Sequence, residues 1–277
     1  MSTALHPEAR LRDLPIAALD FETTGLSPRR SDRVIEVAVV RGRWGETPQR
    51  WHTLVNPDRN VAATQIHGIT DAMVSSQPRF ADIAETLLDQ LRGAVVVAHH
   101  ASFDLSFLEM ELSRMGQAMP TLAALDTLGL ARRVLALHDH RLATLCARFD
   151  LHREHAHRAL DDAHATWQLA HHLALAADPT GDLRLGQAQL LSRRRSPSEV
   201  DEIIHRLEAA RVAGARVTVE YVTSDSASES PIRRPITIVK VTRTRVDAFC
   251  HLREADRTFR LDRLRIVADA PTPPRTG

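Results

Sequence analysis

The sequence predicts an α/β domain built around a mixed central sheet, followed by a smaller β-rich domain. Three observations lead to this fold class. Strand-like and helical stretches alternate over residues 1–178, only strand-like stretches follow a single helix after residue 198, and a segment containing Gln, Arg and Ser separates the two parts. A chain of 277 residues suits two domains of unequal length, and a hydrophobic fraction of 43% is enough for a sizeable core.

The first domain is expected to begin with three strands separated by short turns, and therefore with an antiparallel meander, at residues 16–21, 34–40 and 51–55. The continuous apolar run at residues 94–98 is typical of a strand buried on both faces, and residues 122–126 form a further short strand. Helical periodicity covers residues 80–91, 103–115, 142–149 and 159–175.

The second domain is expected to begin with a helix from Ser198 through Arg211, because Ser198 can cap it and Gly214 follows as a stop. Strand-like segments then follow at residues 217–222, 236–241, 246–252 and 258–261. The predicted boundaries are residues 1–178 for the first domain, 179–197 for an exposed linker, 198–270 for the second domain and 271–277 for a tail.

Composition and charge exclude several classes of protein. The N-terminus lacks the apolar centre of a signal peptide and no stretch is long enough to span a bilayer, so no membrane association is expected. Cys146 and Cys250 lie far apart and fit neither a disulfide framework nor a CxxC metal site, which indicates a reducing cytoplasm. Residues 1–178 hold 18 Arg against 22 acidic residues, whereas residues 179–277 hold 18 Arg and Lys against 13 acidic ones. This asymmetry suits a carboxylate-based metal site joined to a phosphate-binding module.

The first stretch that contains candidate catalytic residues is Asp-Phe-Glu-Thr-Thr-Gly at residues 20–25. Asp20 and Glu22 are two apart at the end of a buried strand, so both side chains point to the same face. Two adjacent carboxylates repel each other and lose solvation unless a cation lies between them. An isolated pair of this kind is more often a solvated strand edge, but the fully apolar run before it favours a metal site.

The second stretch is His-His-Ala-Ser-Phe-Asp at residues 99–104, directly after the most buried strand. Asp104 is therefore expected on the first turn of the following helix. Taken alone, Asp104 would be interpreted as complementing the helix dipole, an effect of a few tenths to ~1 kcal/mol.

The third stretch is His-Arg-Ala-Leu-Asp-Asp-Ala-His at residues 157–164. At 100° per residue, Asp162 shares its helix face with apolar residues and is predicted to point inward, whereas Asp161 shares a mostly polar face. An inward aspartate needs a partner, so Asp162 is the functional candidate. His157 precedes the helix by a short loop, which can bring its side chain close to Asp162.

Together the three stretches resemble the DEDDh exonucleases, the superfamily of the proofreading epsilon subunit of bacterial DNA polymerase III. That family has D-x-E-T-T-G, then an N/H-A-x-F-D box, then H-x-A-x-x-D, and all three occur here in order over roughly residues 13–175. The Ile-His-Gly-Ile segment at residues 66–69 and Leu-Asp-Thr at residues 125–127 match further family elements. His100 stands where the family often has Asn. Tyr221 is the only tyrosine and lies in the other domain, which excludes the sister DEDDy class.

The resemblance implies a ribonuclease H-like fold and a metal-dependent 3′→5′ exonuclease. It further implies that two divalent cations, Mg²⁺ or Mn²⁺, are held by Asp20, Glu22, Asp104 and Asp162, and that His157 is the general base. Oxygen-only ligands suit these ions, and two of them ~3.5–4 Å apart can activate water and stabilise the leaving 3′-oxygen. Histidine can take the proton because its unperturbed pKa is ~6.5. The substrate-binding residues implied by the family are Thr23, Thr24, Gly25, Leu26, His67 and Phe103.

The end of the second domain, Arg-Thr-Phe-Arg-Leu-Asp-Arg at residues 257–263, resembles the C-terminal part of WYL domains, which are small Sm/SH3-like β-barrels. The naming tripeptide is replaced by Thr-Arg-Val at residues 244–246. Arginines on such a barrel are candidates for phosphate contacts, and the alternative is that they form ion pairs with neighbouring acids. The candidates are Arg243, Arg245, Arg253, Arg260 and Arg263.

The sequence thus predicts an enzyme that releases 5′-mononucleotides from single-stranded nucleic acid with a free 3′ end, with DNA favoured over RNA. The second domain is expected to aid nucleic-acid binding. The alternative is a catalytically weak nuclease fold that serves as a regulatory or polymerase-associated binding module. Because a WYL-like domain stands where proofreaders carry a polymerase-binding tail, a stand-alone repair, processing or defence enzyme of the bacterial cytoplasm, working at the nucleoid, is favoured over polymerase association.

Overall fold

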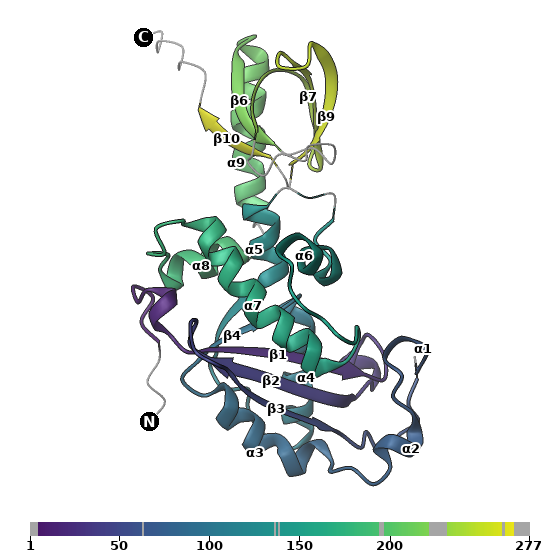
Figure 1. Ribbon diagram of the computed structural model, residues 1–277. Helices are drawn as coiled ribbons and strands as arrows, with labels where there is room; N and C mark the ends of the chain where they lie inside the picture. The colour runs from purple at the N-terminus through teal and green to yellow at the C-terminus, as the bar shows by residue number, and fades with distance from the viewer. Residues whose placement is uncertain are drawn as a thin grey trace. The chain divides into compact units, whose positions relative to one another are not determined.

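The computed structural model describes residues 5–62, 64–135, 137, 139–193, 197–221, 232–261 and 264–268. The chain divides into two compact units (Figure 1). The first consists of Met1–Val134 and His140–Arg193, and the second of Arg194–Gly277 with the short segment Leu135–Asp139. Each unit has its own hydrophobic core.

The first unit is built on a five-stranded mixed sheet with the strand order β3-β2-β1-β4-β5. β1, β2 and β3 form the expected antiparallel meander, whereas β4 pairs parallel to β1 and β5 pairs parallel to β4. The predicted strands are confirmed with ends shifted by at most two residues. The strands are β1 (Ile16–Thr23), β2 (Val34–Gly42), β3 (Gln49–Leu54), β4 (Val95–Ala98) and β5 (Ala123–Asp126).

Successive side chains along each strand point to opposite faces of the sheet, so the core of this unit is divided between the two faces. Odd-numbered residues of β1, such as Ala17 and Leu19, pack with α3 (Phe80–Leu91) and α4 (Ala101–Arg114). Even-numbered residues, such as Ile16 and Ala18, pack with α7 (Ala159–Ala177). Figure 1 shows α3 and α7 on opposite sides of the sheet. The remaining helical segments are η1 (Leu11–Asp13), η2 (Pro28–Arg30), α1 (Thr64–His67), α2 (Asp71–Val74), α5 (Thr127–Val134) and α6 (Leu142–Phe149).

The expected linker at residues 179–197 is wrong over most of its length. Residues Leu185–Ser192 form α8, and Leu185 and Ala188 are buried in the core beneath α7 together with Leu183. The backbone of this region pairs with the N-terminal segment, since Leu185 N donates to Ala9 O at 2.9 Å. The partners of α8 are therefore distant in sequence, and its own composition does not reveal them.

The close approach of α5 and α8 requires a residue without a side chain at position 129. A Cβ placed on Gly129 would lie 1.8 Å from the carbonyl oxygen of Ser192. Glycine is therefore the residue that lets the backbones of these two helices meet.

The second unit consists of one helix and an antiparallel sheet with the order β10-β6-β7-β8-β9. Its helix and four predicted strands are confirmed in place, and β10 is a further strand that the sequence does not predict. Among the described residues the strand pairing is that of an open sheet, so closure into the expected Sm/SH3-like barrel is not seen. The elements are α9 (Pro197–Val212), β6 (Arg216–Tyr221), β7 (Ile232–Val241), β8 (Arg245–Cys250), β9 (Ala255–Arg260) and β10 (Arg265–Ala268).

Two further expectations fall partly or wholly outside the described residues, namely Arg263 and the tail at residues 271–277. Within the part of the chain that is described, no helix has the length and apolar character needed to cross a membrane.

Candidate active site

Two of the predicted carboxylates lie side by side at the end of β1. Asp20 and Glu22 occupy the same strand face as Ile16 and Ala18, which is the face covered by α7. Burial raises the pKa of Asp20 well above its ordinary value, and the charges of Asp104, Asp162 and Glu22 raise it further. Burial, together with the charge of Asp162, also raises the pKa of Glu22 from 4.5 to about 7. Both carboxyl groups therefore lie in an excess of negative charge.

Asp104 is brought to this place by the turn from β4 into α4. His100 precedes the helix with φ 84°, and the Asp104 side chain is 4% exposed. β4 pairs with β1 only as far as Ala18, and beyond that point Asp104 Oδ1 accepts a hydrogen bond from Phe21 N at 3.1 Å. Burial raises the pKa of Asp104 to about 8. Complementing the dipole of α4 would not require Asp104 to be buried against β1. That interpretation therefore does not account for its position.

Asp162 points inward from the first turn of α7, as its helix phase predicts. Asp162 is 6% exposed, whereas the side chain of Asp161 is 29% exposed and accepts a hydrogen bond from His155 N at 2.9 Å. Asp162 is therefore the member of the pair that joins Asp20 and Glu22.

An arginine that sequence reasoning missed contacts Asp162. Arg153 forms a bidentate ion pair with it, through Nε to Oδ1 and through Nη2 to Oδ2 at 2.6 Å. The charge of Arg153 also lowers the pKa of Asp20 and of Glu22, against the other influences on them. Arg153 thus supplies positive charge among the carboxylates. The loop before His157 contains several charged residues, and nothing in its sequence distinguishes Arg153 from them.

His157 lies at the edge of the same cluster. It is exposed and has φ 63°, and the loop around it leads into α7. Donor atoms of Glu22, His157 and Asp162 all lie within 4.8 Å of one another, close enough to bind one metal ion. These residues, with the half-buried carboxylate of Asp20 and the buried carboxylate of Asp104, offer mainly oxygen ligands. Such a set fits a hard divalent cation such as Mg²⁺ or Mn²⁺.

A second missed residue, Glu36, anchors the loop that carries His157. Glu36 is 0% exposed and lies opposite Glu22 in the pairing of β1 with β2. Its carboxylate accepts hydrogen bonds from Arg158, with Nη2 to Oε1 at 2.8 Å, and from Ala159 N at 3.0 Å. These contacts hold the beginning of α7 against the sheet. The sequence contains a signal for it, since Glu36 is the only charged residue in an otherwise apolar run at residues 34–40.

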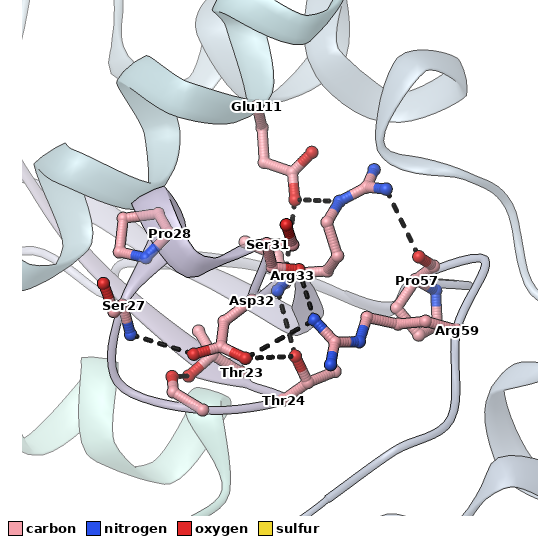
Figure 2. A network of polar contacts seen from close by, with 12 residues as sticks. Thr23, Thr24, Ser27, Pro28, Ser31, Asp32, Arg33, Pro57, Arg59 and Glu111 are labelled. Carbon is pink, nitrogen blue, oxygen red and sulfur yellow. Dashed lines mark hydrogen bonds and ion pairs between the residues drawn. The ribbon is translucent and has the colours of Figure 1, made fainter.

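The loop after Glu22 positions the first group of predicted substrate-binding residues. Thr23 Oγ1 donates to Gly25 O at 2.6 Å, and Thr24 N donates to Arg33 O at 2.9 Å (Figure 2). A Cβ on Gly25 would lie 2.4 Å from Oδ2 of Asp32, so the loop fits only glycine there without a shift. Leu26 is 86% exposed and therefore accessible to a ligand.

Of the other two predicted substrate-binding residues, His67 is buried and Phe103 is half-buried. His67 is 5% exposed, its Nδ1 accepts from Ile69 N at 3.1 Å, and its Nε2 lies 3.1 Å from Ala62 O. Both ring nitrogens thus stabilise its own loop, which leaves neither for a hydrogen bond to substrate. Phe103 packs against Phe107 with ring centroids 4.9 Å apart and is partly buried.

The arginines singled out in the second unit are exposed where they are described. Arg243 pairs with Asp201 at 2.7 Å, as the ion-pair alternative expects. Arg245 and Arg260 are direct cross-strand neighbours on β8 and β9, and Arg253 follows β8. Arg263 lies outside the described residues.

Comparison with known proteins agrees with this division into two units. The RNase T family model, whose description is "Exonuclease", matches residues 17–170, and the WYL domain model matches residues 202–268. The WYL match falls within the second unit, and the exonuclease match falls within the first apart from the short segment Leu135–Asp139.

Curated relatives match a little over half of this chain. The chain is 39% identical over 161 residues to the PolC-type DNA polymerase III of Oceanobacillus iheyensis, a match that covers 56% of this chain but only 11% of that polymerase. It is 38% identical over 165 residues to the DNA polymerase III subunit epsilon of Treponema pallidum, and here the match covers 56% of this chain and 76% of the subunit.

A solved structure of Exonuclease X in complex with 5′ overhanging duplex DNA is similar in fold, with a TM-score of 0.53 and 27% sequence identity. The match covers 64% of this chain and 99% of that one.

Proposed function

Because the chain belongs to the exonuclease family whose model matches residues 17–170, we propose that it hydrolyses single-stranded nucleic acid from the 3′ end and releases 5′-mononucleotides. The observation that carries this proposal is the cluster of acidic side chains from β1, α4 and α7, whose burial and mutual repulsion raise the pKa of Asp20, Glu22 and Asp104. A fold does not gain stability from such a cluster, whereas a cation-dependent active site requires one.

Asp20, Glu22, Asp104 and Asp162 are the residues that would hold the cations. When bound, two Mg²⁺ or Mn²⁺ ions would supply an activated water and stabilise the charge on the leaving 3′-oxygen. His157 is exposed beside Glu22 and Asp162, where it can accept a proton from the attacking water. Glu36 and Arg158 keep the loop of His157 in place.

Arg153 competes with a cation for Asp162, because its guanidinium contacts both carboxylate oxygens. In the metal-free protein this arginine offsets part of the repulsion among the acids. The ion pair should therefore weaken cation binding at Asp162.

DNA is the favoured substrate because the relatives are named for DNA polymerases and Exonuclease X was solved with DNA. The exposed Leu26 lies on the loop that follows Glu22, where it can contact the terminal nucleotides. The second unit is proposed to aid binding, since the cross-strand arginines Arg245 and Arg260 place two positive charges together on its surface. We propose a stand-alone enzyme rather than a polymerase subunit, because the WYL domain follows the nuclease.

The test is a cleavage assay on a single strand labelled at its 5′ end, with Mg²⁺, with Mn²⁺ and with chelator. The proposal expects a ladder of shortened labelled products, release of 5′-mononucleotides, no reaction in chelator and protection by a blocked 3′ end. Asp20→Ala should remove the activity while the chain still folds. Equal cleavage by Asp20→Ala and the parent would contradict the assignment. A parent enzyme that binds the strand but never shortens it would favour the alternative of a binding module.

A further inference from the structure

A second polar cluster lies on the first unit, where the connection between β1 and β2, the segment after β3 and the last turn of α4 meet. It surrounds a hollow of about 380 Å³. Four arginines line this hollow, namely Arg30, Arg33, Arg59 and Arg114. None of them belongs to the acidic cluster, and the proposed hydrolysis uses none of them.

Glu111 fixes two of these arginines from beneath. It is 1% exposed, and its Oε1 accepts a hydrogen bond from Arg33 Nε at 2.8 Å and lies 3.2 Å from Arg114 Nη1. Figure 2 shows Glu111 pointing from its helix toward Arg33. The other oxygen, Oε2, is buried and has no hydrogen-bond partner among the described residues. One buried carboxylate thus serves two guanidinium groups, which keeps two like charges close together.

Asp32 is the other carboxylate of the cluster, and its charge is also shared. Its Oδ1 lies 3.5 Å from Arg59 Nη1, and its Oδ2 accepts a hydrogen bond from Ser27 N at 3.0 Å. Arg59 additionally donates to Ser31 O, and Figure 2 shows it extended toward Asp32. The guanidinium of Arg59 is therefore held at the rim rather than neutralised by a dedicated partner.

The hollow carries an excess of positive charge. Asp58 also lines it, but pairs with Arg79 outside the lining at 3.1 Å. Arg30 is exposed, and within the described part of the chain its side chain makes no hydrogen bond or ion pair. Glu111 contacts Arg33 and Arg114, and Asp32 contacts Arg59, so two carboxylates serve the four arginines and an excess of two positive charges remains. An anion is the ligand that such a site attracts.

The cluster is joined directly to the active-site loop. Thr24 N donates to Arg33 O at 2.9 Å, and Arg33 N donates to Thr24 Oγ1 at 3.0 Å, two residues after Glu22. α4 makes a second connection, because it carries Asp104 near its beginning and Glu111 seven residues later. Seven residues correspond to roughly 10 Å along a helix. The hollow thus lies beside the active site but not in it.

We propose that this hollow binds a phosphodiester group of the nucleic-acid substrate upstream of the 3′ end that enters the acidic cluster. The inference rests on the proposed nuclease function. A planar guanidinium can donate two hydrogen bonds to phosphate oxygens. Arg33 and Arg114 already donate to the carbonyl oxygens of Pro57 and Pro28, which fixes their positions at the hollow, and the exposed guanidinium of Arg30 supplies the donors for phosphate. The proposed site neutralises phosphate charge of the nucleic-acid backbone and contacts no base, so it should bind strands of any sequence.

The experiment measures binding of a fluorescent single strand of about ten nucleotides by anisotropy, in chelator, over a series of salt concentrations. The variants are Arg30→Gln and Arg30→Glu, because this exposed residue contributes charge without a structural contact. Loss of one phosphate contact should weaken binding equally on different sequences and reduce the slope of log affinity against log salt by about one unit. Arg30→Glu should lose more affinity than Arg30→Gln. The matched control is Arg92→Gln, which removes an exposed arginine that pairs with Asp89 at 2.7 Å elsewhere on the unit.

Unchanged affinity and slope in Arg30→Glu would overturn the proposal. Inorganic phosphate at matched ionic strength is the second probe. Phosphate that binds the parent but not Arg30→Glu, while the two chains bind the strand equally, would assign the hollow to free phosphate and overturn the proposal. Because binding is measured in chelator, it needs no hydrolysis. If the parent chain binds through Arg30 but cleaves nothing, the nuclease function alone is refuted. If the enzyme cleaves but Arg30→Glu leaves the slope of log affinity against log salt unchanged, this site alone is refuted.

Discussion

Replacing Glu22 by Gln should stabilise the metal-free protein at alkaline pH, even though it damages the active site. Burial first, and then the charges of Asp162 and Glu36, raise the pKa of Glu22 from 4.5 to about 7. The folded protein therefore retains the proton of Glu22 at pH values where the unfolded chain has lost it. The free energy of unfolding consequently falls as the pH rises from about 4.5 to about 7, and the full destabilisation is present above pH 7.

The magnitude follows from the two pKa values. Each unit of difference corresponds to ~1.4 kcal/mol, so the shift from 4.5 to about 7 corresponds to about 3 kcal/mol at pH 8. Glutamine cannot ionise and should recover this amount. For a domain of this size 1 kcal/mol changes the melting temperature by ~2–4 °C, so the variant should melt roughly 6–12 °C higher. At pH 5 the same relation leaves a gain below about 1 kcal/mol.

The assay is thermal unfolding followed by circular dichroism in chelator at pH 8 and pH 5. The control is Glu85→Gln, which makes the same chemical change at an exposed position of α3 and should alter stability by less than ~0.5 kcal/mol. A Glu22→Gln variant that melts at or below the parent temperature at pH 8 would refute the reasoning, because it would show that the ionised carboxylate does not destabilise the metal-free fold. A gain that is equal at both pH values would also refute it, since burial of a neutral side chain would then be the cause.

Four other changes test the remaining assignments. Asp162→Asn should abolish hydrolysis whereas Asp161→Asn should keep nearly the parent rate, as measured on a saturating oligonucleotide; equal losses would contradict the different roles of the two faces of α7. His157→Ala should lower turnover by roughly 10²–10⁴-fold with Mn²⁺ binding retained in calorimetry, and a loss of Mn²⁺ binding would make this residue a ligand instead. Arg153→Gln should tighten Mn²⁺ binding and lower the melting temperature in chelator, because the guanidinium competes for the carboxylate but offsets its charge; unaltered Mn²⁺ affinity would exclude that competition. A chain truncated after Arg193 should still cleave a short oligonucleotide but bind longer strands more weakly, and identical binding at every length would exclude a contribution of the second unit.

The sequence predicts most of the first unit because its signals are local. Buried strands have apolar runs, and the period of α7 is regular enough to distinguish Asp162 from Asp161 by helix phase alone. The three acidic stretches are each short and lie at the ends of such elements. Their convergence follows from the order of the strands and from the resemblance, and the structure brings their side chains into one electrostatic cluster.

What the sequence does not reveal depends on contacts between distant residues. Arg153 pairs with Asp162 across a loop whose conformation has no sequence signature, and α8 is recognisable only once the N-terminal segment is seen beside it. The resemblance assigns His67 to substrate binding, but His67 is buried and both its ring nitrogens contact the backbone of its own loop, at Ala62 O and Ile69 N. Glu36 is the exception, because a lone charge in an apolar strand already indicates a buried partner.

A crystal of the protein grown with Mn²⁺, measured at a wavelength where manganese scatters anomalously, tests the central claim most directly. The account predicts manganese density in contact with Asp20, Glu22, Asp104 and Asp162. Crystals of Asp20→Ala should lose this density at equal Mn²⁺ concentration. Manganese that is absent from the acidic cluster at saturating Mn²⁺ would contradict the account.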